Sequence, residues 1–140
     1  MRTCKTELLT ALVVALKLAL PALPVSTKKN WFENDSNTAY PYIYIGEVYQ
    51  TEDGPKNFYR YNVELLIHVV YKDVTDLADL YTSQNAVLGL IKAGKSLTLT
   101  NNFEIIDTYL MSSNDIEVQV DSGILNVGLI RVRYDIWDKQ

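Results

Sequence analysis

Two stretches of alternating apolar and polar residues, separated by an Asp-Gly-Pro, constrain the fold of this chain most. The first begins at Pro41, the second runs from Tyr59 to Lys72, and Asp53, Gly54 and Pro55 lie between them. These three residue types favour a turn, and strand residues two apart share a face. The second stretch has one apolar face, formed by Tyr59, Tyr61, Val63, Leu65, Ile67, Val69 and Tyr71. The pattern predicts a long aromatic hairpin with one buried side.

Residues at helical spacing precede and follow this hairpin. Residues 6–20 end at Pro21 and place one set of apolar residues at helical spacing: Leu8, Leu9, Leu12, Val13, Leu16 and Leu20. Residues 73–93 repeat the pattern before Gly94. Residues 22–39 form an extended polar loop that carries Trp31 and Phe32, and we expect these two aromatic residues to pack on the domain or on a neighbouring subunit.

Two further strands are expected after the second helix. The third strand covers residues 103–111, residues 112–115 turn the chain, and residues 116–120 form a short alternating piece. The last strand covers residues 125–137. The sequence therefore predicts one α+β domain over residues 1–140, with a mostly antiparallel four-stranded sheet, a possible extra short hairpin, and two helices packed on one face.

The amino terminus partly fits a secretory signal, because Arg2 and Lys5 precede a leucine-rich run. Glu7 and Lys17 interrupt that run, and the apolar segment is shorter than the roughly 20 residues that span a bilayer. We expect a retained amphipathic helix and no membrane contact. The alternative is a secreted binding domain behind a signal of about 22 residues.

The chain offers little for chemistry. Its net charge of -4 gives no general attraction for nucleic acid or anionic lipid, and Cys4 is its one cysteine. His68, the one histidine, lies among polar neighbours on a strand and is expected to be an ordinary exposed or interfacial residue. No glycine-rich loop joins a strand to a helix as phosphate binding requires. We expect no catalytic residues, cofactor or metal, and hence no enzyme.

The order of elements resembles the tail-terminator (tail completion) proteins of long-tailed bacteriophages. The resemblance covers nearly the whole chain and is carried by the strand "YPYIYIGE" from Tyr40, the strand "YRYNVELLIHVVY" from Tyr59 and the closing strand "GLIRVRYDI" from Gly128. It implies a structural virion protein of the neck or tail, assembled in the host cytoplasm. In that role a ring of identical subunits, usually six, would cap the tail tube and join the head connector.

The resemblance also implies partners and contact residues. The partners would be further copies of the chain, the tail tube protein and a head-completion or connector protein, and genomic DNA would pass without specific binding. We expect neighbouring rings to contact the tip at Asp53, Gly54 and Pro55 and the loop 112–122 with Asn114 and Asp115. Arg131 and Arg133 are expected to pair with Glu47, Glu64 or a neighbour. A head-completion or connector protein of the neck is the alternative at this level.

Overall fold

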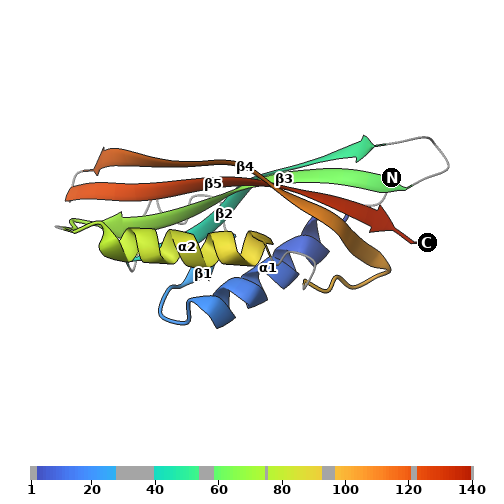
Figure 1. The fold of residues 1–140 in the computed structure, drawn as a ribbon, viewed down its shortest axis with the longest axis horizontal. Coiled ribbons are helices and arrows are strands. Elements are labelled where there is room, and N and C mark those ends of the chain that lie inside the picture. Colours follow the sequence, from blue (N-terminus) through green and yellow to red (C-terminus); the bar gives the residue numbers. More distant parts are fainter. Residues whose placement is uncertain are drawn as a thin grey trace.

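The computed structural model describes residues 3–27, 40–53, 59–74, 76–92, 97–120 and 123–139. Figure 1 shows two helices beside one long sheet. In chain order the elements are α1 (Lys5–Ala19), β1 (Val25–Ser26), β2 (Tyr42–Asp53), β3 (Arg60–Lys72), α2 (Ala78–Lys92), β4 (Phe103–Val120) and β5 (Gly123–Asp138). The α+β prediction is confirmed, and the predicted hairpin is formed by β2 and β3.

The sheet has five strands in the order β1-β2-β3-β5-β4, one more than predicted. The four long strands are antiparallel to their neighbours, whereas β1 runs parallel to β2 through Val25 and Ser26. A further backbone hydrogen bond, from the Ile43 N–H to the Pro24 carbonyl oxygen (2.8 Å), holds this pair together. The sheet is therefore mixed, because residues 25–26, placed by the sequence in a loop, add a short parallel strand.

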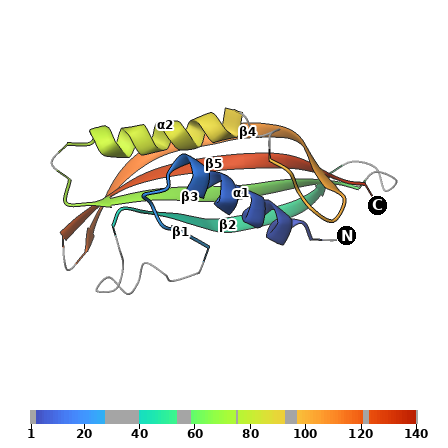
Figure 2. The same ribbon diagram turned by 90° about the horizontal axis from the view of Figure 1, so that it is seen from below.

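Both helices lie on the same face of the sheet, as predicted (Figure 2). In α1 the residues Leu8, Leu12 and Leu16 are buried, as their spacing of four residues requires for a helix with one apolar side. They pack against alternate residues of β3 and β5, from Val63 to Val69 and from Ile130 to Ile136. Burying one such leucine contributes roughly 1.5–3 kcal/mol, so α1 is an integral part of the core.

Two boundaries differ from the prediction. Residues 112–115 form no turn, because β4 continues through them and pairs with β5 from Phe103 to Val120, with register shifts at Ile105/Asp107 and Leu110/Ser112. The helix expected from Asp73 begins at Ala78. Asp73 adopts a left-handed conformation (φ 52°), and its carboxylate accepts a hydrogen bond from the Ile124 N–H (2.9 Å).

The sheet face opposite the helices, called the open face below, carries a smaller apolar cluster at one end. Tyr42, Val70, Leu125 and Val127 are buried there, with Tyr44 and Leu129 beside them. The tyrosines of the first hairpin therefore divide by position: Tyr61 lies in the main core and Tyr42 in this cluster. Tyr59 was expected to face the core and is instead exposed, as is Tyr49.

Candidate assembly surfaces

The open face joins Arg131 of β5 to Glu47 of β2 across the intervening strand β3. Arg131 Nη2 lies 3.5 Å from Glu47 Oε2, and both side chains are partly exposed. Glu47 reaches this position because β2 has a register shift between Gly46 and Tyr49, where Glu47 takes φ 52°. The predicted pairing of Arg131 with Glu47 is confirmed as a long, solvent-screened ion pair, which contributes at most about 1 kcal/mol.

Arg133 is held by neighbours on β4 and β5. Its guanidinium lies 4.3 Å from the centre of the Tyr109 ring, and its Nε is 3.3 Å from Asp135 Oδ1. Arg133 Nε and Asp135 Oδ1 form no hydrogen bond with each other, so their attraction is purely electrostatic. The Tyr109 hydroxyl donates to Asp107 Oδ2 (3.1 Å), which raises the pKa of Tyr109. Arg133 also lies opposite Glu64 in the β3–β5 register, although Asp135 is its ion-pair partner.

The remaining predicted contact residues are distributed over separate places. Asn114 and Asp115 are in the middle of β4 and belong to no loop, which corrects the prediction. Asp115 Oδ1 accepts a hydrogen bond from Gln84 of α2, so it anchors that helix to the sheet. Asp53 ends β2. Trp31, Phe32, Gly54 and Pro55 lie outside the described residues.

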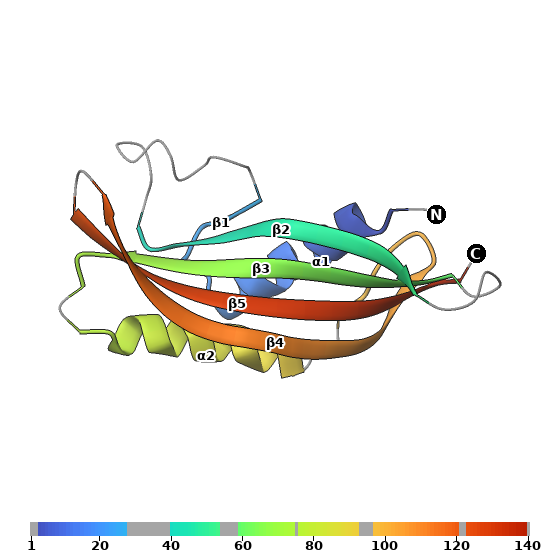
Figure 3. The same cartoon turned by 90° about the horizontal axis from the view of Figure 1, so that it is seen from above.

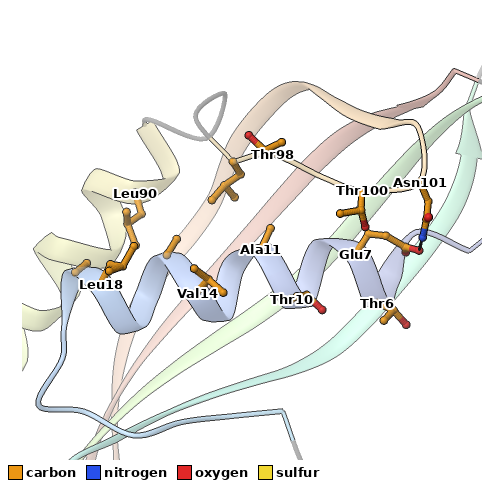
Figure 4. Close-up of a pocket in the computed structure, with 13 residues that line it drawn as sticks. Thr6, Glu7, Thr10, Ala11, Val14, Leu18, Leu90, Thr98, Thr100 and Asn101 are labelled. Atoms are coloured by element: carbon orange, nitrogen blue, oxygen red, sulfur yellow. Dashed lines mark hydrogen bonds between the residues drawn. The ribbon is translucent and has the colours of Figure 1, made fainter.

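Sequence reasoning missed a groove along α1 (Figure 4). It has a volume of about 760 Å³ and lies between α1, Leu90 near the end of α2 and residues 97–101. Val14 and Leu18 are its exposed apolar walls. At one end Glu7 Oε1 accepts a hydrogen bond from Asn101 Nδ2 (2.9 Å). The sequence signal was the presence of these two apolar residues outside the Leu8-Leu12-Leu16 stripe.

Sequence reasoning also missed how much apolar surface β4 exposes. Tyr109, Leu110, Met111, Ile116 and Val118 are all exposed on this outermost strand. The sequence signal was the 18-residue run from Phe103 to Val120, which contains no glycine, proline, lysine or arginine. Lysine and proline are residues that commonly protect an edge strand from pairing with another chain, and β4 lacks both.

The titratable groups show no reaction centre in the part of the chain that the structure describes. His68 is half-buried with its ring 5.3 Å from that of Tyr44, and burial lowers its pKa, so the imidazole is neutral at pH 7. Burial raises the pKa of the Cys4 thiol to about 11. Among the described residues no group of three or more His, Cys, Asp or Glu could hold a metal ion. None of the described helices is long and apolar enough to cross a membrane.

Comparisons with known proteins show a likeness of fold without a likeness of sequence. No family model matches the chain, and no curated protein matches it. Among solved structures, a chain from the virion of a native gene transfer agent (GTA) particle is similar, with a TM-score of 0.73 and 12% identity. The match covers 98% of this chain and 99% of that chain. The two chains therefore share one α+β fold over their full lengths, and the fold is one that occurs in a virion.

Proposed function

We propose that this protein is a structural subunit of a bacteriophage-like virion. The observation that carries the proposal is the full-length fold match to a chain of a gene transfer agent virion. A fold can host many functions, so the exposed surfaces of this protein must also suit a virion subunit. They do so because the described residues expose apolar side chains on β4 and along the groove beside α1, where another protein could make contact.

Within the particle, the chain acts as a tail terminator: a ring of identical subunits, six by the tail-terminator resemblance, which caps the tail tube and joins it to the head connector. The order of helices and strands supports this role, because it is the order that the resemblance of the sequence to tail-terminator proteins implies. A subunit that works by self-association needs an extended sheet with outer strands that copies can share, and the five-stranded sheet of the described residues is compatible with that. A head-completion or connector protein of the same neck is the second candidate, because it would need the same features.

The position in the particle separates these two candidates. Purified protein is expected to give rings by negative-stain electron microscopy and a closed oligomer by native mass spectrometry. Particles labelled with an antibody to this chain are expected to carry the label at the top of the tail tube. Label confined to the head side of the neck would favour the connector, and label absent from particles, with only monomers in solution, would contradict the virion role.

The secreted binding domain makes a different prediction about the first helix. The packing of Leu8, Leu12 and Leu16 into the main core supports a retained helix, because cleavage after about residue 22 would expose the core surface beneath it. Mass spectrometry of the mature protein is expected to find these residues. A mature chain that begins after α1 would favour secretion.

A further inference from the structure

The described part of the sheet has two outer long strands, β4 on one side and β2 on the other (Figure 3). On one side β4 is outermost and pairs only with β5. On the other side β1 pairs with β2 at Ile43 and Tyr44, and no other described strand lies beside the segment from Ile45 to Asp53. Unpaired N–H and C=O groups along a strand are a template for a strand of another chain.

The directions of the strands make these two edges compatible with each other. The four long strands β2, β3, β5 and β4 alternate in direction, so β2 and β4 run in opposite senses. Copies related by rotation about an axis along the strands keep these directions. The β4 edge of one copy would then meet the β2 edge of the next copy in the antiparallel sense, which continues the pattern within each subunit.

The register across the sheet places matching residues at the two edges. Tyr49 pairs with Glu64, Glu64 with Arg133, and Arg133 with Tyr109, so Tyr49 and Tyr109 are the two ends of one cross-strand row. Both tyrosines are exposed, at 59% and 39%. Aromatic pairs on neighbouring strands stabilise a sheet, so these two rings are suited to meet across a joint between copies.

The charges along the two edges allow β4 of one copy to lie beside β2 of the next. The two adjacent rows on the same face end at Thr51 on β2 with Asp107 on β4 and at Gly46 with Ser112, so neither row would bring two carboxylates together between copies. The outermost row ends at Asp53 and Glu104, which are both acidic. Lys139 Nζ lies 3.5 Å from Glu104 Oε2 and offsets that charge.

We propose that neighbouring copies of this protein join by antiparallel pairing of β4 with the Ile45–Asp53 segment of β2, with Tyr109 of one copy beside Tyr49 of the next. This inference rests on the proposed ring and names the contact that builds it. The result is one continuous sheet around the ring, in which the exposed Tyr109, Leu110 and Met111 of β4 lie along the neighbour's strand.

Site-specific cross-linking tests the joint. The variant carrying both Tyr49→Cys and Tyr109→Cys, treated with a short bis-maleimide, is expected to give a ladder of cross-linked species that ends at the size of the closed ring. Each single variant is expected to stay uncross-linked, because one cysteine per copy meets no second cysteine at the joint. The native Cys4 gives no background, since it is fully buried and its side chain contacts Gln50.

The possible outcomes distinguish the proposed contact between β4 and β2 from the formation of a ring. A closed oligomer by native mass spectrometry without a cross-linked ladder would overturn this joint and leave the ring intact. Dimers from Tyr109→Cys alone would show two β4 edges facing each other, which also overturns the proposal. Monomers at every concentration, with no cross-linking, would contradict both the joint and the ring.

A second pair of variants tests the edge without cysteines. Leu110→Lys combined with Met111→Lys adds charge to exposed positions of β4. We expect this variant to raise the dissociation constant of the oligomer at least tenfold and to leave the unfolding midpoint of the subunit unchanged. Tyr81→Lys is the matched control, because Tyr81 is an exposed residue on α2 and belongs to neither outer strand. Equal assembly of the β4 variant and the wild type would count against the joint.

Discussion

Gly123 begins β5 in a backbone conformation that other residues rarely adopt. Its φ is 154°, and a Cβ at this position would collide with the carboxylate of Asp73. That carboxylate already accepts the Ile124 N–H, and the Asp73 N–H donates to the Ile124 carbonyl oxygen (2.9 Å). The junction between β3 and α2 is therefore fixed to the start of β5 by Asp73, and this arrangement leaves no room for a side chain at Gly123.

We predict that Gly123→Ala lowers the free energy of unfolding by about 1–3 kcal/mol, because it adds both a strained conformation and a collision. The measurement is urea unfolding followed by circular dichroism. Gly89→Ala is the matched control: Gly89 is in α2, an added Cβ meets nothing within 4 Å, and alanine stabilises a helix by roughly 0.5–1 kcal/mol. Equal effects of the two substitutions would contradict this account of Gly123.

Cys4 is expected to be unreactive in the folded protein. Burial raises the pKa of its thiol from 9.0 to about 11, so at pH 8 the thiolate fraction falls by about a hundredfold. Because the residue is also fully buried, labelling by a thiol reagent should be slow in buffer and fast in denaturant. Labelling at the same rate in both conditions would show that the contact between α1 and β2 opens freely.

The sequence predicted individual residues well where a strict period determined their environment. Val63, Leu65, Ile67 and Val69 are buried as the alternation of β3 required. Asp73 was read as part of the helix start, yet it binds Ile124, which is far away in the chain. Among the described residues, it is Asp76 that caps the helix locally, by accepting the Ala78 N–H (3.0 Å). A partner distant in sequence leaves no local pattern, so sequence reasoning could not find it.

At the scale of elements, α1 is stabilised by its buried side. We predict that Leu12→Ala destabilises the protein by about 2–5 kcal/mol, because Leu12 is only 1% exposed and the substitution leaves a cavity. Leu18→Ala in the same helix should change stability by less than about 0.5 kcal/mol, since Leu18 is 81% exposed. Thermal unfolding of the two variants measures the difference, and similar midpoints would mean that α1 contributes little to the core.

The elements that the sequence located correctly are those with long, uninterrupted periods. α1, α2, β3 and β5 were found within a few residues of their bounds, apart from the start of α2. The turn expected in β4 was wrong because Ser112, Ser113 and Asn114 are turn-forming residues locally, whereas pairing with β5 keeps them extended. β1 has only two residues, too few to show any period.

At the scale of the whole molecule, charge limits what the protein can bind. Net charge is -4, and Arg131 and Arg133 on the open face each have a carboxylate within ion-pair distance. We predict no measurable binding to linear duplex DNA at 0.1 M salt, because affinity for DNA depends on cations free to contact phosphates. A gel-shift assay measures this. Glu47→Lys with Glu64→Lys, which makes the open face basic, should bind DNA and lose binding as salt rises.

Tight binding of DNA by the wild-type protein would contradict this interpretation of the open face. Sequence reasoning included Glu47 among the candidate partners of Arg131 because strand periodicity placed the two arginines on a polar face of the sheet. It could not reach Tyr109 as the neighbour of Arg133, because the register of Tyr109 depends on a bulge between Ile105 and Asp107. A bulge shifts every later residue by one position, which composition and periodicity do not reveal.

The shortest strand has a consequence for how the subunit could be controlled. β1 is attached to β2 by two residue pairs and the Ile43–Pro24 hydrogen bond, so it is among the least firmly held parts of the sheet. Its detachment would leave two more residues of β2 without a described strand beside them and would remove Val25 from its packing against the main core. Amide hydrogen exchange would therefore be fastest at this strand, and a ligand that fastened or released it would set how much of β2 is accessible to another molecule.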